Sequence, residues 1–165
     1  MYWTDHGNVP KIEKASMDGT SRTAIHTTTL TTPYGLTLDY DTQTLYWTDY
    51  SRNRIEKSSV DGTNRVLVTT TNVLDPYFIT YYDGVLYWGD WSYNRLLMTS
   101  ISSPNTVTFL TSSANDPYGI HVIAKERQRE GMFAGKSHYC NGYSYYSKTN
   151  LRCERNTMSH TCFFV

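Results

Sequence analysis

The side chains best suited to chemistry lie near the C-terminus, where three cysteines and two histidines share the last 28 residues. Thiolates and imidazoles are preferred zinc ligands, but the Cys-x-x-Cys spacing of structural zinc sites is missing, so we predict no metal site. A disulfide between two of the cysteines, formed in an oxidising compartment, is the favoured interpretation. The odd count leaves one cysteine unpaired or paired outside this chain. The five residues are His138, Cys140, Cys153, His160 and Cys162.

Signatures of other function classes are missing from the sequence. It has no Gly-x-Ser-x-Gly elbow and no glycine-rich phosphate loop, and its five histidines are scattered. Fifteen basic residues balance fifteen acidic ones, so the charge footprint of a nucleic-acid-binding protein is absent. We find no apolar run of about 18 residues, no signal peptide and no Asn-x-Ser/Thr acceptor. We therefore predict no catalysis, no cofactor and no nucleic-acid partner.

A five-residue motif recurs three times, as MYWTD, LYWTD and LYWGD. Its tyrosines are Tyr2, Tyr46 and Tyr87, which are 44 and 41 residues apart. Pro-Tyr pairs and Asp-Gly turns repeat in step with the motif. A period near 42 with four strand-like runs per unit is typical of a β-propeller blade.

The second unit is complete enough to predict its strands. Runs rich in β-branched and aromatic residues cover 34–40, 45–49, 54–60 and 65–69. Turn residues separate them, including an Asp-Gly pair that strongly indicates a hairpin. No helical period competes over any long window.

Alternation along the motif strand places bulky side chains on both faces. Leu45, Trp47 and Asp49 share one face, whereas Tyr46 and Thr48 share the other. We expect the aromatic pairs to pack between neighbouring blades, where burying each ring contributes roughly 2–3 kcal/mol. We expect the aspartate to accept loop N–H groups or to pair with an arginine. These structural residues are Tyr2, Trp3, Asp5, Tyr46, Trp47, Asp49, Tyr87, Trp88 and Asp90.

The motif, its period near 42 and the Pro-Tyr pairs and Asp-Gly turns that repeat with it together resemble the YWTD (class B) repeats of the low-density lipoprotein receptor family. The opening segment MYWTDHGNVPKIEKASMDGTSR is similar to the Wnt co-receptor branch of the receptor-related proteins, as is DPYGIHVIAKERQ. The resemblance covers residues 1–128 and implies a six-bladed propeller followed by an EGF-like module. The sequence therefore predicts an all-β fold with about three four-stranded antiparallel blades in 1–128. Residues 129–165 form a divergent cysteine-containing tail, irregular or a degenerate EGF-like module.

Three repeats in place of six leave two incomplete sheets at the ends. We call the first of the four strands of a blade its inner strand. The first blade lacks this strand, and 118–124 is predicted to be an inner strand without the strands that would follow it. Such edges favour pairing with other chains. We interpret the chain as part of a larger receptor ectodomain whose remaining blades complete the ring. A second copy, which would give three plus three repeats, is the alternative.

The most promising contact surface lies where the loops after the motif meet the loops before the inner strands. Rings at equivalent blade positions, with charges nearby, favour a protein or peptide contact. The resemblance adds that this face binds secreted ligands and that Trp91 matches a contacting tryptophan of the Wnt co-receptor branch. The candidates are Trp91, Tyr50, His6, Asp75, Asp116, Arg52 and Arg95.

The resemblance implies an extracellular, ligand-binding part of a single-pass receptor that binds Wnt ligands or antagonists. The membrane would be reached only through the rest of the parent receptor. An endocytic lipoprotein-type receptor and an extracellular-matrix scaffold are alternatives. A metal-dependent propeller hydrolase is a remote one, because the inner strands are mainly apolar or aromatic where such enzymes need converging ligands.

Overall fold

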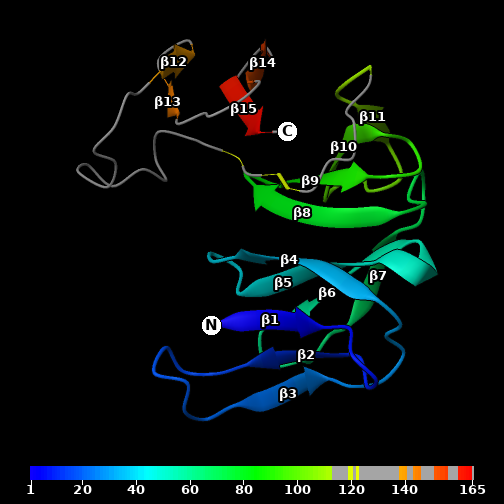
Figure 1. The fold of residues 1–165 in the computed structure, drawn as a ribbon, viewed down its shortest axis with the longest axis vertical. Coiled ribbons are helices and arrows are strands. Elements are labelled where there is room, and N and C mark those ends of the chain that lie inside the picture. The colour runs from blue at the N-terminus through cyan, green and yellow to red at the C-terminus, as the bar shows by residue number, and fades with distance from the viewer. Residues whose placement is uncertain are drawn as a thin grey trace.

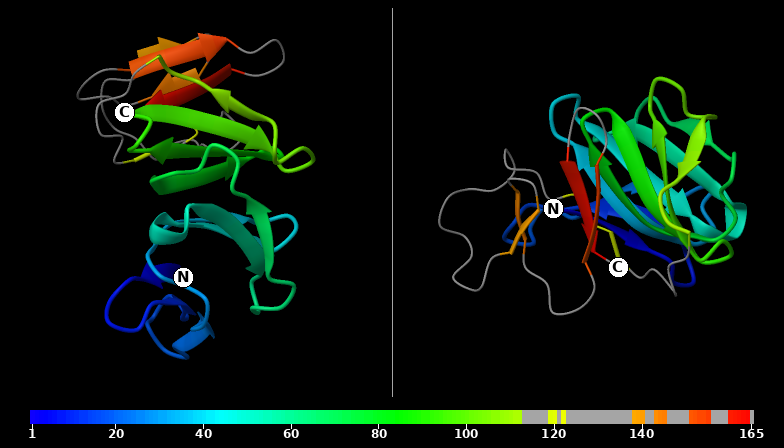
Figure 2. Two further views of the ribbon diagram at one scale, coloured as in Figure 1. Left: turned by 90° about the vertical axis from the view of Figure 1, so that its right-hand side faces the viewer. Right: turned by 90° about the horizontal axis from the view of Figure 1, so that it is seen from above.

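The structure is a computed structural model that describes residues 1–112, 119, 120 and 122, together with the backbone of four short strands between 138 and 164. Three antiparallel sheets follow one another along the chain and lie side by side (Figures 1 and 2). We refer to them as the first, second and third blades. The all-β, partial-propeller fold expected from the sequence is confirmed.

The first blade has three strands and the other two have four each, always in chain order from one edge to the other. The first contains β1 (Tyr2–Asp5), β2 (Lys11–Lys14) and β3 (Thr23–His26). The second contains β4 (Pro33–Asp39), β5 (Thr44–Asp49), β6 (Arg54–Ser59) and β7 (Val66–Thr69). The third contains β8 (Pro76–Tyr82), β9 (Val85–Asp90), β10 (Arg95–Ser100) and β11 (Val107–Phe109).

Two hairpins are described near the C-terminus. Strand β12 (His138–Cys140) pairs with β13 (Tyr143–Tyr145), and β14 (Leu151–Arg155) pairs with β15 (His160–Phe164). The predicted domain boundary at 128/129 lies outside the described residues, as does most of the predicted inner strand 118–124. That boundary remains a prediction.

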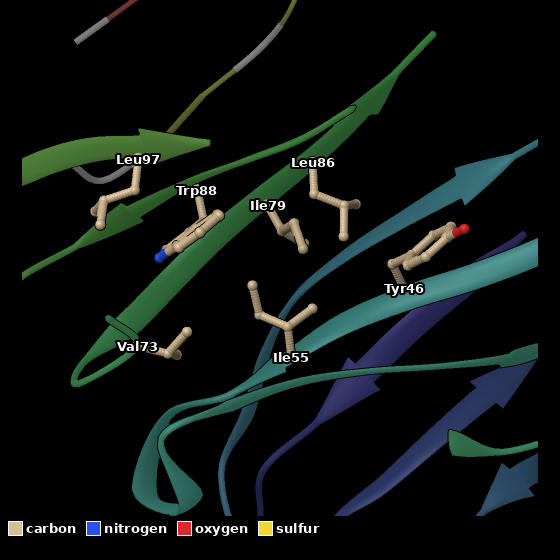
Figure 3. Packing of buried hydrophobic residues seen from close by; sticks show 7 residues of the cluster. All are labelled: Tyr46, Ile55, Val73, Ile79, Leu86, Trp88 and Leu97. Atoms are coloured by element: carbon tan, nitrogen blue, oxygen red, sulfur yellow. The ribbon is translucent and has the colours of Figure 1, made fainter. Parts of the chain in front are cut away.

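The core between the second and third blades follows from the alternation in the motif strands. Tyr46 and Ile55 project from the second blade toward Ile79, Leu86 and Trp88 of the third (Figure 3). The neighbouring ring in the motif, Trp47, points the other way and lies 5.1 Å from the His26 ring of the first blade. The motif strand β5 therefore packs against both adjoining blades, as a sandwiched sheet requires.

The inner strands β4 and β8 approach each other closely at Gly35. A Cβ atom at this position would lie 2.7 Å from the Ile79 amide nitrogen and 2.8 Å from the Tyr77 carbonyl oxygen. The Thr48 hydroxyl strengthens the contact, since it accepts the Gly35 N–H at 2.9 Å and donates to the Tyr77 carbonyl at 3.1 Å. This close approach fixes how the two blades present the loops at their shared end.

Candidate functional site

The motif aspartates hold the loops at one end of the blades. Asp49, at the end of β5, accepts the N–H groups of Thr31 and Thr32, both at 2.9 Å. In the third blade Asp90 accepts those of Leu74 at 2.9 Å and Asp75 at 3.1 Å. The loop before each inner strand is thereby fixed beside the loop that follows the motif.

Backbone bonds complete the link between the two kinds of loop. The Tyr50 N–H donates to the Thr32 carbonyl at 2.9 Å, and the Trp91 N–H donates to the Asp75 carbonyl at 3.1 Å. Tyr50 and Trp91 are therefore each positioned by the loop before the inner strand of their own blade.

Five rings from three blades form a continuous group at this end of the molecule, which we call the aromatic row. The members touch in sequence: His6 lies 4.9 Å from Tyr34, Tyr34 lies 4.3 Å from Tyr77, and Tyr77 lies 4.2 Å from Trp91. Tyr50 is 5.5 Å from Tyr34 and 6.4 Å from Trp91. His6 is exposed and the other four rings are half-buried. The row offers a broad amphipathic surface of the kind that anchors protein interfaces.

Asp75 forms a polar margin of the aromatic row. It accepts a short hydrogen bond from the Ser92 hydroxyl and lies close to Tyr50. Burial, followed by the nearby Asp75 carboxylate, raises the pKa of Tyr50 above its ordinary value. The second blade has a neutral version of the Asp75–Ser92 link, in which the hydroxyls of Thr32 and Ser51 lie 2.6 Å apart.

The predicted cations are placed differently from one another. Arg52 ends the short 3-10 turn Tyr50–Arg52, and its buried Nε has no hydrogen-bond partner among the described residues. Arg95 turns away toward the outer strand, with its guanidinium 5.2 Å from the centre of the Phe109 ring. Asp116 lies outside the described residues. The structure thus gathers His6, Tyr50, Trp91 and Asp75 but does not bring Arg95 to the row.

Two members of the aromatic row were not among the residues selected from the sequence. Tyr34 and Tyr77 follow the prolines that begin the inner strands β4 and β8. They connect His6 to Trp91, because the inner strands converge at the blade junction. The repeated Pro-Tyr pair was the available signal.

Metal ligands and membrane helices can be assessed within the described part of the chain. No cluster of three or more histidine, cysteine, aspartate or glutamate side chains suited to a metal ion occurs there. In the same residues, no helix has both the length and the apolar character needed to cross a bilayer.

The first motif segment lies within a match to a known repeat family. The family described as low-density lipoprotein receptor repeat class B matches residues 1–40. A curated relative, the vitellogenin receptor Yl of Drosophila melanogaster, is 43% identical over 49 residues, which is 30% of this chain and 2% of that protein.

Solved structures agree with the repeat assignment. A nidogen/laminin complex contains a chain matched with a TM-score of 0.61 and 32% identity, covering 67% of this chain and 43% of that one. A virginiamycin B lyase from Staphylococcus aureus matches with a TM-score of 0.57 at 21% identity, over 73% of this chain and 41% of the lyase, which supports the propeller fold alone. The chain spans less than half the length of these solved chains.

Proposed function

We propose that this chain is the extracellular ligand-binding part of a low-density lipoprotein receptor-related protein, and that it binds secreted proteins through the aromatic row. The observation that carries the proposal is the continuity of five rings across three blades. Large rings with restricted rotamers lose little entropy on binding, and such residues dominate interface energetics. The role is recognition and not catalysis.

Among ligands, we propose Wnt proteins or their secreted antagonists, acting in Wnt signalling at the cell surface. The support is the resemblance of the first 22 residues to the Wnt co-receptor branch and the position of Trp91 next to the motif. Trp91 stacks on Tyr77 with an interplanar angle of 11°, which fixes the orientation of its ring. The Asp75 carboxylate beside it favours a ligand group that donates hydrogen bonds.

Two other roles have specific support. The match to a vitellogenin receptor favours an endocytic receptor for lipid-carrying proteins. The similarity to a chain of a nidogen/laminin complex favours a matrix scaffold. Both alternatives keep protein binding by the propeller and differ in the partner.

The decisive experiment presents the full chain to one member of each ligand class in surface plasmon resonance: a Wnt antagonist, a yolk lipoprotein and a laminin fragment. We expect the antagonist to bind, and Trp91→Ala to weaken its binding at least tenfold, the loss typical of an interface anchor. Tyr40→Ala is the matched control, because Tyr40 is 73% exposed in the turn at the opposite end of β4. Preferential binding of the yolk protein or laminin would redirect the assignment. Equal affinity of wild type and Trp91→Ala would exclude the aromatic row.

A further inference from the structure

The loop between β3 and β4 is the most threonine-rich stretch of the sequence. Five of its six residues, 27–32, are threonines, and Pro33 follows directly. The exposed ones are Thr27, Thr28, Thr29 and Thr31. The corresponding loop of the next blade, 70–75, has the same length but only two threonines. Threonine-rich sequence next to a proline is typical of chains that carry sugars on their hydroxyl groups.

Two side chains of the second blade hold the backbone of this loop in place. Arg65 donates to the carbonyls of Thr28 at 2.7 Å and Thr29 at 3.1 Å. Asp49 accepts two backbone N–H groups of the loop, both at 2.9 Å. Thr29 has a φ of 54°, in the left-handed region that β-branched residues rarely adopt. All of these anchors use backbone atoms, so the loop is fixed without engaging its threonine hydroxyls.

Three hydroxyl groups of this loop have no hydrogen bond to any residue that the structure describes. They belong to Thr27, Thr28 and Thr31. Of the other two, the Thr29 hydroxyl donates to the Thr28 carbonyl at 2.7 Å, and the Thr32 hydroxyl lies 2.6 Å from that of Ser51. The three exposed hydroxyls can therefore be modified without breaking an internal bond.

The threonines at the end of β7 and in the loop that follows it are used differently. Asn105 of the third blade accepts the hydroxyls of Thr69 at 3.2 Å and Thr71 at 3.3 Å. Thr70 is the exposed threonine of that group. In one loop the hydroxyls join two blades, whereas in the other they make no contact that the packing of the blades requires. This difference favours a role for the threonines of 27–31 outside the fold itself.

We propose that Thr27, Thr28 and Thr31 are acceptors for mucin-type O-glycosylation, with N-acetylgalactosamine as the first sugar. In this step the threonine Oγ1 forms a bond to the anomeric carbon of the sugar, and the bond between that carbon and the diphosphate of a nucleoside-diphosphate donor breaks. The hydroxyl proton leaves with the released nucleoside diphosphate. The proposal rests on the proposed function in one respect, because these transferases act on proteins that enter the secretory route.

The acceptor loop lies beside the aromatic row. The Thr32 carbonyl accepts the Tyr50 N–H at 2.9 Å, and Tyr34 stands two residues further along, at the start of β4. Sugars on 27–31 would therefore flank the proposed ligand surface without replacing any of its rings.

The first test incubates the purified full chain with UDP-N-acetylgalactosamine and a polypeptide N-acetylgalactosaminyltransferase. We expect the intact mass of the folded wild type to rise by N-acetylhexosamine, and electron-transfer fragmentation to place the sugar within 27–31. Combined Thr27→Ala, Thr28→Ala and Thr31→Ala substitutions should abolish the increase. They keep every backbone donor and acceptor, so the urea midpoint should stay at the wild-type value. Thr70→Ala is the matched control and should keep the increase, because Thr70 is the exposed threonine of the corresponding loop.

The second test expresses the full chain behind a secretory leader in mammalian cells that cannot extend O-glycans beyond the first sugar. We expect the same mass increase at the same threonines. Neither test needs a ligand, so a chain that carries the sugar but fails to bind the Wnt antagonist would count against the proposed function alone.

Three results would overturn the proposal. A wild type without added sugar, in the transferase reaction or in cells, would show that the loop is not an acceptor. An equal mass increase in the triple variant would place the acceptors elsewhere. Modification that appears only after unfolding in urea would show that the folded loop is closed to the enzyme.

Discussion

The rings of Tyr77 and Trp91 are stacked, with centroids 4.2 Å apart and planes 11° from parallel. One residue begins an inner strand and the other follows the motif of the same blade, so the stack joins the two loops that the motif aspartate Asp90 holds together. The orientation of Trp91 therefore depends on Tyr77.

Replacing Tyr77 should affect ligand binding without a direct contact being required. We expect Tyr77→Leu to reduce affinity about three- to tenfold, because aromatic pairs contribute roughly 0.5–1.5 kcal/mol beyond their buried area. Tyr77→Phe keeps the stack and should retain wild-type affinity. Isothermal titration calorimetry with the ligand that binds in the surface plasmon resonance experiment measures the affinity of both variants. Equal losses in the two variants would point to the hydroxyl in place of the ring.

Gly35 should be intolerant of even one extra carbon. We expect Gly35→Ala to lower the free energy of unfolding by about 1–3 kcal/mol, since its Cβ would collide with the backbone of β8. The matched control is Gly119→Ala, which occupies the same repeat position with nothing within 4 Å of the added atom. Urea unfolding followed by tryptophan fluorescence distinguishes them. Similar midpoints for both variants would contradict the close approach of the inner strands.

Arg65 should stabilise the joint between the first and second blades more than Arg22 stabilises its own blade. Arg65→Met removes two bonds to carbonyls of the neighbouring blade as well as the Glu56 pair, and we expect a loss of about 2–4 kcal/mol. Arg22→Met removes the Glu13 pair and the contact with the Trp3 ring, which matches the contact of Arg65 with Trp47, and should cost clearly less. The difference in urea midpoints isolates the inter-blade bonds. If the two losses match, the carbonyl contacts contribute nothing.

The joint at His26 should weaken in mild acid. The ring is buried, bonds the Ser58 hydroxyl at 2.9 Å and packs on Trp47, with Arg65 and Glu56 as the nearby charges. Burial, and then the Arg65 charge, lower the pKa of His26. The neutral ring is thus the folded form, and stability falls as the pH drops below the ordinary histidine pKa of about 6.5, where the unfolded state binds the extra proton.

Melting curves can show this dependence. Between pH 7.5 and 5, the Tm of the wild type should fall by about 2–4 °C more than that of His26→Gln, a difference that corresponds to about 1 kcal/mol in a chain of this size. Parallel pH profiles for the two proteins would assign the acid sensitivity to other groups.

The second C-terminal hairpin indicates which cysteines pair. Cys153 and Cys162 are opposite each other in the backbone register of β14 and β15. We therefore expect a Cys153–Cys162 disulfide after oxidative folding, with Cys140 left open to alkylation. Peptide mapping without reduction tests the pairing, and a peptide linking Cys140 to either residue would refute it.

The sequence was sufficient to predict the blades because their signals are local. Alternation and Asp-Gly turns placed the motif strand at 45–49, where the structure has Thr44–Asp49, and the fourth strand at 65–69, where it has Val66–Thr69. The motif aspartates accept loop amides, as expected for carboxylates at strand ends.

The candidate site was only partly predictable because it depends on distances between blades. The inclusion of Tyr34 in the aromatic row follows from the convergence of β4 and β8, which Gly35 permits and which no local pattern specifies. Likewise, Arg95 packs on Phe109 because the outer strand β11 places this ring beside it. Asn53 adopts a left-handed conformation, with φ of 51°, that closes the short turn after Tyr50 and was not anticipated.

The two complete joints use different connectors, and this difference determines which blades can be neighbours. Arg65 spans the first joint, whereas Asn105 spans the second by accepting the hydroxyls of Thr69 at 3.2 Å and Thr71 at 3.3 Å. In the third blade, Leu97 and Thr106 occupy the places of Glu56 and Arg65, so this blade has no ionic connector to offer. Exchanging these blades by recombination would therefore leave a charged side chain or an amide without its partner at a joint. The side chains at the joints therefore specify the order of the blades, in addition to the connectivity of the chain.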